Sequence, residues 1–186
     1  MTYIPDVGYI PRMTYPPSSI YEIKPKPEIK QGANFEGADL RFADLFRKDF
    51  RYANLRKANL EGKKIELAYF AGADFREANL KGANLFRGSY KVANFEGANL
   101  EEAGILTNLQ SANFRKANLR DACLGSSDLG MANFEGANLE KAILSQADLR
   151  EAYLVDANML ETELKETKLE GAIIDDGEGR EYILGE

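Results

Sequence analysis

Six aspartates occupy the same position of a five-residue repeat, and these are Asp39, Asp44, Asp49, Asp74, Asp128 and Asp148. Carboxylates placed this regularly could act as general acids or bases, or could collect cations. Asparagine fills the same position in most of the other repeats, however, and an amide cannot replace an acid or a base. We therefore predict that these side chains accept hydrogen bonds from the backbone, as Asn and Asp do in turns.

Other reactive groups are few. Cys123 is the single cysteine, so no internal disulfide can form, and the chain contains no histidine that could activate the thiol. Asp175, Asp176 and Glu178 could attract a cation, but the rest of an EF-hand ligand set is missing. No glycine-rich loop has phosphate-binding spacing. We expect no catalytic residue, no metal, no cofactor and no enzymatic activity.

The repeat that carries the aspartates dominates the chain. Its first position is small, the second is Asn or Asp, the third is Leu or Phe, and the fourth and fifth vary. The period of five continues to the end of the repeat, except that one residue is missing between Gly104 and Asn108. A fixed short period of this kind indicates a repeat architecture.

A second period of twenty appears when the third-position residues are followed across the missing residue. They form four columns, which begin with Phe35, Leu40, Leu45 and Phe50, and phenylalanine gathers in the first column. Independent repeats would show no such preference, so four repeats make one coil and about seven coils stack. Like residues on like residues then form a continuous core, with the small first-position residues also facing inward.

This A(D/N)LXX pattern resembles the pentapeptide-repeat family over residues 33 to about 174. The resemblance implies an all-β solenoid, a right-handed quadrilateral β-helix whose four sides per coil are joined by β-turns. It also implies a bacterial, often cyanobacterial, source. Lys48 and Lys63 depart from the pattern at the small inner position. A long cationic side chain does not fit there, so we expect both lysines to reach outward or to bend the backbone.

Three segments follow from the pattern. Residues 1–32 form an extended Pro/Tyr-rich arm with all six prolines, residues 33–171 form the β-helix, and residues 172–186 form a C-terminal cap or tail. A spacing of six places four arm tyrosines on one side of an extended chain, at Tyr3, Tyr9, Tyr15 and Tyr21. This arm either lies along the body or docks on a partner. We expect the apolar tail to cover the last coil, and residues 20–29 to cover the first.

Composition limits the classes of partner. The net charge is −6, which disfavours direct binding to nucleic acid, and no run of about 18 apolar residues could span a membrane. We expect a cytoplasmic protein.

Charge is divided along the chain, because residues 33–92 carry 12 Lys/Arg and 8 Asp/Glu, and residues 93–171 carry 7 Lys/Arg and 14 Asp/Glu. The two halves therefore differ in sign, at +4 and −7.

The variable positions hold the candidate binding residues. In the third column the fourth-position residues are Phe46, Glu66, Phe86 and Leu106, one above another. Leu67 and Tyr52 are neighbouring fifth-position residues, as are Val92 and Met131. Outward apolar side chains in a stripe usually mark a contact surface. We predict that Phe46, Phe86, Leu106, Leu67 and Tyr52 bind protein, together with the four arm tyrosines.

Two functions are consistent with this organisation. The first is a non-catalytic scaffold or interaction module that binds another protein or a larger assembly, or associates with itself. The second comes from the resemblance alone, because some pentapeptide-repeat proteins mimic a DNA duplex and protect type II topoisomerases such as gyrase. A mimic needs rows of negative charge, and the first half of this β-helix is basic.

Overall fold

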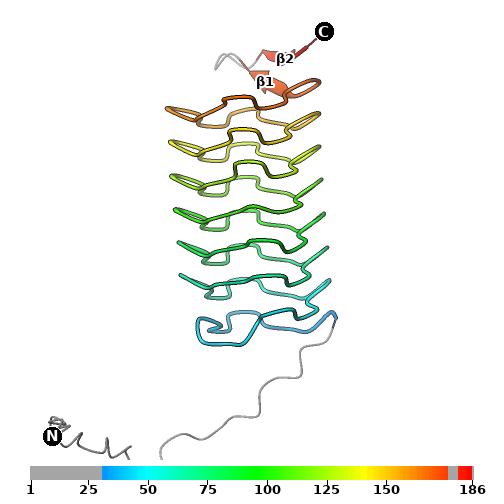
Figure 1. Cartoon of the computed structure of the whole chain (residues 1–186), viewed down its shortest axis with the longest axis vertical. Coiled ribbons are helices and arrows are strands. Elements are labelled where there is room, and N and C mark those ends of the chain that lie inside the picture. The colour runs from blue at the N-terminus through cyan, green and yellow to red at the C-terminus, as the bar shows by residue number, and fades with distance from the viewer. Residues whose placement is uncertain (1–30, 176–179, 186) are drawn as a thin grey trace, which may run out of the picture.

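The computed structural model describes residues 31–175 and 180–185 of the chain. Successive turns of backbone stack along the long axis of the molecule, as Figure 1 shows. Parallel bridges join second-position residues 20 apart, as in Asn34–Asn54–Asp74 and Asn59–Asn79–Asn99. Each side of a turn contributes a single bridging residue, so this β-solenoid contains few regular strands. In the described ranges these are β1 (Ile173–Asp175) and β2 (Glu181–Ile183).

The corners between sides are four-residue turns. The first-position N–H of one repeat donates to the third-position carbonyl of the repeat before it, as from Ala38 to Phe35 at 2.9 Å. The fifth-position residue has positive φ at every complete corner except that of Phe42, with 65° at Gly37 and 56° at Lys57, which matches the requirement of a type II turn. The recurrent fifth-position glycines meet this requirement without steric cost.

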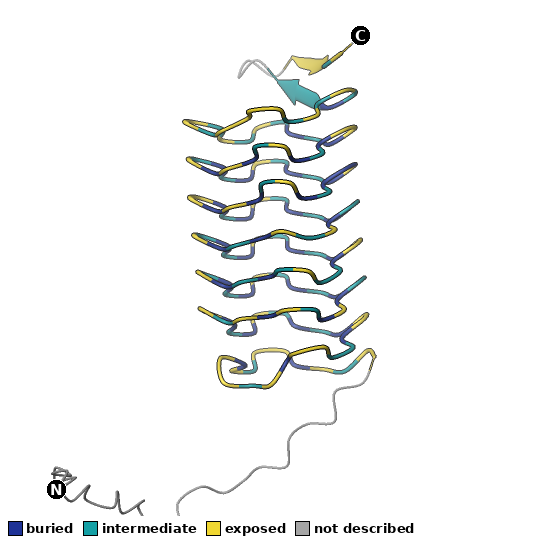
Figure 2. Cartoon of the chain, viewed as in Figure 1, coloured by how far each residue is buried: buried dark blue, intermediate teal, exposed yellow. Residues whose placement is uncertain are grey.

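The interior consists of third-position side chains and first-position alanines. Buried residues are dark blue in Figure 2, where they recur on every turn from the second onward. Rings of the same column stack face to face. The Phe50 and Phe70 centroids lie 4.6 Å apart, and those of Phe75 and Phe95 lie 4.8 Å apart. These distances equal the spacing of neighbouring β-strands, so one ring fits per turn. The predicted column core is confirmed.

The missing residue shortens one turn without ending the stack. The bridge register falls from 20 to 19 at Ser89–Asn108 and returns to 20 at Asn108–Asp128. The fifth position is absent between Leu106 and Thr107, so the usual corner hydrogen bond cannot form there. The buried Ser127 hydroxyl donates to the carbonyl of Ile105 at 2.8 Å instead.

The two inner-position lysines behave as predicted. Lys63 extends to the preceding turn, where its Nζ donates to the carbonyl of Arg41 at 3.2 Å. Lys48 places its Nζ 3.8 Å from Asp44 Oδ2. Asp44 makes no bridge with Lys64 in the described structure, although the equivalent residues of the other three columns are bridged. The lysines therefore reach outward, and the backbone of the first turn is displaced beside them.

The two ends of the stack differ. The C-terminal strand β2 pairs antiparallel with β1, and the Gly171 N–H donates to the carbonyl of Leu184 at 2.7 Å. The tail covers only part of the end, because Leu164 is 37% exposed, whereas Leu144 below it in the same column is fully buried. The tail therefore lies at the end of the stack, as expected, and leaves part of the last coil exposed. Residues 20–29, expected to cover the other end, lie outside the described residues.

Candidate interaction surface

The outward side chains of the first two columns are engaged with one another. Along the second column the second-position asparagines form a ladder, with Asn79 Nδ2 3.3 Å from Asn59 Oδ1 and the same contact repeated up to Asn158. Charges on neighbouring turns also pair, as in Lys81–Glu101 at 3.0 Å and in the first column Arg115–Glu135 at 2.9 Å. Few of these groups are free to recruit a partner.

The third and fourth columns carry apolar side chains on the outside. We define the apolar surface as Phe46, Tyr52, Leu67, Tyr69, Phe86, Val92 and Leu106. Large fractions of the side chains are exposed, with 51% for Phe46, 62% for Tyr52 and 44% for Leu106. The bridges at Asn84–Gly104 and Asp49–Tyr69 place these residues on successive turns of two adjacent sides.

Two rings of the apolar surface rest on glycines of the next turn. A Cβ atom at Gly104 would lie 3.1 Å from Phe86 Cε1, and one at Gly72 would lie 2.6 Å from Tyr52 Cδ1. Phe86 is consequently half-buried, as is Leu67. Because these glycines have no side chain, the two rings can lie close to the backbone of the next turn.

The sequence-predicted residues divide into two groups. Phe46, Phe86, Leu106, Leu67 and Tyr52 all lie on the same two sides, with the exposed Glu66 between Phe46 and Phe86. Whether they bind a partner stays a prediction. The four arm tyrosines, Tyr3, Tyr9, Tyr15 and Tyr21, lie outside the described residues.

Two exposed aromatic side chains of the β-helix, Tyr69 and Phe42, were not among the binding residues predicted from the sequence. Tyr69 is 55% exposed and belongs to the apolar surface, and its presence at an Asn/Asp position was the available signal. Phe42 is the most exposed large apolar side chain of the described residues. It lies in the second column, where the Arg41 guanidinium carbon is 5.6 Å from its ring centroid.

The second-position carboxylates serve the backbone, as predicted. Asp49 Oδ1 accepts from the N–H of Arg51 at 3.1 Å, as Asn34 Oδ1 accepts from Glu36. The Arg51 side chain also donates to this carboxylate, which lowers the pKa of Asp49. Cys123 is exposed. In residues 31–175 and 180–185 no group of three or more acidic or thiol side chains is arranged to hold a metal ion.

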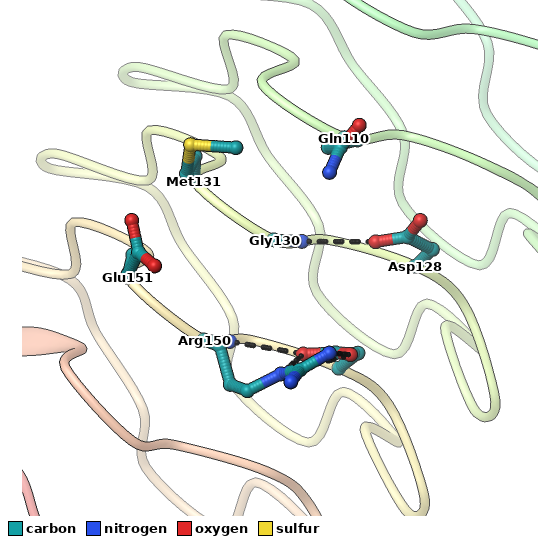
Figure 3. Close-up of a pocket in the computed structure, with 7 residues that line it drawn as sticks. Gln110, Asp128, Gly130, Met131, Arg150 and Glu151 are labelled. Carbon is teal, nitrogen blue, oxygen red and sulfur yellow. Dashed lines mark hydrogen bonds and ion pairs between the residues drawn. The ribbon is translucent and has the colours of Figure 1, made fainter.

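A shallow depression of about 270 Å³ opens on the fourth column (Figure 3). It lies over Gly130, whose neighbours in the same repeat position are Gln110 on one turn and Arg150 on the other. The remaining lining residues are Asp128, Met131, Asp148 and Glu151. Because Gly130 has no side chain, a gap is left in an otherwise continuous row. The repeat pattern alone does not predict this depression.

Comparison with known proteins finds one matching family and several similar solved structures. A family profile described as "Pentapeptide repeats" matches in eight copies over residues 31–62, 53–87, 105–130 and 132–171. None of the curated proteins compared shows a significant match. No helix in the described part of the chain is long and apolar enough to cross a membrane.

Three solved structures illustrate the similarity. A trypsin-treated variant of QnrB1, a plasmid-mediated fluoroquinolone resistance protein, is 16% identical over 80% of this chain and 90% of its own, with a TM-score of 0.35. HetL, involved in heterocyst differentiation regulation in the cyanobacterium Nostoc sp. PCC 7120, is 24% identical over 79% and 91%, with a TM-score of 0.25. Rfr23 from the cyanobacterium Cyanothece 51142 is 25% identical over 78% and 86%, with a TM-score of 0.22.

Proposed function

Because the chain belongs to the pentapeptide-repeat family, we propose that it is a non-catalytic interaction module that binds another protein or a larger assembly. Its rod, a right-handed four-sided β-helix of about seven coils, presents the apolar surface to the partner. The tyrosines of the arm contribute to the same contact.

One observation carries this proposal. The two sides with paired charges and an asparagine ladder expose Phe42 on the first turn and Leu160 on the last, whereas the adjacent two sides expose apolar side chains on most of their turns, including Phe46, Tyr52, Tyr69, Val92, Leu106 and Met131. Such segregation is typical of a contact surface, because burying one of these side chains contributes roughly 1.5–3 kcal/mol.

Mimicry of a DNA duplex receives less support from the surface. Fourth-position charges of the second column alternate in sign, through Arg41, Glu61, Lys81, Glu101, Arg120 and Glu140. A mimic of phosphates would need one sign throughout. We therefore expect purified gyrase to supercoil DNA at the same rate with and without micromolar protein, and clear protection or inhibition would favour this second function instead.

The proposed function is tested by binding after targeted substitution. A tagged protein carrying Phe46→Ser and Leu106→Ser should no longer bind its partner in an extract of the native host. Both substitutions remove an apolar side chain that the partner would bury. The matched control carries Glu61→Ser and Arg120→Ser on the second column, and it should bind as well as the unsubstituted protein. Equal binding by both variants would reject the apolar surface as the binding site.

A further inference from the structure

Four repeats contain an arginine two residues after a second-position aspartate. The pairs are Asp39–Arg41, Asp49–Arg51, Asp74–Arg76 and Asp148–Arg150. In each of them Arg Nε lies 2.9 Å from Asp Oδ1, and Nη2 contacts Oδ2. The chain therefore shows four times how a guanidinium binds over this kind of aspartate, in the two-pronged geometry that carboxylates favour.

Asp128 has the same position in its repeat, but Gly130 stands where the arginine would be. Its Oδ1 accepts from the Gly130 N–H at 3.3 Å, and its Oδ2 accepts from Asn108 Nδ2 at 3.2 Å. No ion pair joins Asp128 to a cation within the described residues. The depression over Gly130 therefore lies where a fifth guanidinium would belong, as the neighbouring Asp148–Arg150 pair in Figure 3 illustrates.

We propose that this depression binds an arginine side chain of the partner protein, with the guanidinium over Asp128 as that of Arg150 lies over Asp148. The inference rests on the proposed function and identifies part of the partner's surface. Glu151 at the edge supplies a second carboxylate, and Met131 supplies an apolar contact for the aliphatic part of the arginine.

The charge of the depression and its place on the rod both favour an arginine of another protein as the ligand. Three carboxylates and one guanidinium line the depression, so its lining has a net charge of −2. The surrounding residues 93–171 have a net charge of −7. Arginine suits the site better than lysine, because its planar fork can bond to both oxygens of Asp128. Met131 shares the fifth position of the fourth column with Tyr52 and Val92. The depression therefore lies on the same side of the rod as Tyr52 and Val92, two turns of the fourth column beyond Val92.

The fold should tolerate the substitutions that test this proposal. Asparagine occupies the second position in many repeats, so Asp128→Asn removes the charge and leaves an amide that can pair with Asn108 as the stacked asparagines of the second column do. A Cβ at Gly130 would meet Asp128 Oδ1 at 3.5 Å and the Arg150 carbonyl at 3.7 Å, which are ordinary contacts. Gly130→Arg can therefore recreate the Asp-x-Arg pair within the chain and fill the depression.

The experiment follows backbone amide signals of the isotope-labelled full chain by NMR while N-acetyl-arginine methylamide is added. Saturable shifts should centre on Gly130 and Met131 at millimolar probe, since one exposed ion pair is weak. Asp128→Asn should weaken binding at least about fivefold, and Gly130→Arg should abolish it. The control Asp74→Asn removes the same charge from another side and should leave binding unchanged. The neutral citrulline analogue should cause no saturable shifts.

Three outcomes would overturn the proposal. These are equal shifts with citrulline, unchanged binding by Asp128→Asn, and binding that appears only after Arg12→Ala, which would make the chain's own arm the occupant. If the arginine probe fails while a partner still depends on Phe46 and Leu106, only this inference is lost. If the probe binds but no partner depends on those residues, the proposed function fails and the arginine site stands.

Discussion

The hydroxyl of Ser127 donates to the carbonyl of Ile105 on the preceding turn, at the one corner of the solenoid that lacks a residue. The N–H of Thr107 lies 3.4 Å from the same hydroxyl oxygen. Together these contacts give the Ile105 carbonyl and the Thr107 N–H a partner at the short corner. The Thr162 and Thr167 hydroxyls also donate to a carbonyl of the preceding turn, so a hydroxyl at the alanine position can provide this contact on other turns too.

Ser127→Ala should destabilise the protein, although alanine is the usual residue at this position. The Ile105 carbonyl would lose its buried partner, at a cost of about 1–3 kcal/mol in the free energy of unfolding. Chemical denaturation measures this quantity. Ser126→Ala, at the neighbouring exposed position, provides the control and should change little. A neutral or stabilising Ser127→Ala would show that the hydroxyl is not needed at the short corner.

Tyr90→Phe should stabilise the protein. Tyr90 is fully buried with its ring stacked on that of Phe70, its hydroxyl has no hydrogen-bond partner in the described structure, and burial raises its pKa. Removing the hydroxyl should increase the free energy of unfolding by about 1 kcal/mol, since phenylalanine already fills this column at Phe70. The reciprocal Phe70→Tyr should destabilise. A loss of stability in Tyr90→Phe would mean that the hydroxyl makes a favourable contact.

Stability should fall as the pH drops below about 4. The arginine hydrogen bonds lower the pKa of Asp74 and of Asp148, and they lower that of Asp39 to about 2. A depressed folded-state pKa contributes stability above the unfolded value near 3.9, and this contribution is lost as pH falls toward the folded value. Between pH 5 and pH 2 the Asp74→Asn variant should lose less free energy of unfolding than the unsubstituted protein, because Asp74 belongs to the most buried of these pairs. An equal dependence of the free energy of unfolding on pH in the two proteins would contradict this assignment.

The core of the fold was predictable because it depends on one periodic rule. Third-position residues from Phe35 to Leu154 are buried, and the outward reach of Lys63 followed from its length alone. The incomplete C-terminal cover was not predictable. Exposure of Leu164 depends on where β2 pairs with β1, and residues 175–185 no longer follow the five-residue pattern that would set this position.

The candidate site was predictable only in part. The period of twenty residues predicted that Phe46 and Leu106 face outward. It could not show that Gly104 leaves room for the Phe86 ring beside the backbone of the next turn. The depression over Gly130 depends on comparing one Asp-x-Gly repeat with four Asp-x-Arg repeats whose geometry only the structure displays. Periodicity identifies which side chains face outward, whereas the absence of a side chain becomes informative only in three dimensions.

Site-specific photo-crosslinking tests the central claim most directly. A photoreactive phenylalanine analogue would replace Phe46 or Leu106 on the apolar surface, and Glu61 or Arg120 on the second column as controls, in the native host. We expect the same protein partner to crosslink from both apolar positions and from neither control, and an excess of unsubstituted protein to compete. Equal crosslinking from all four positions, or crosslinking from the controls alone, would contradict an interaction module that binds through this surface.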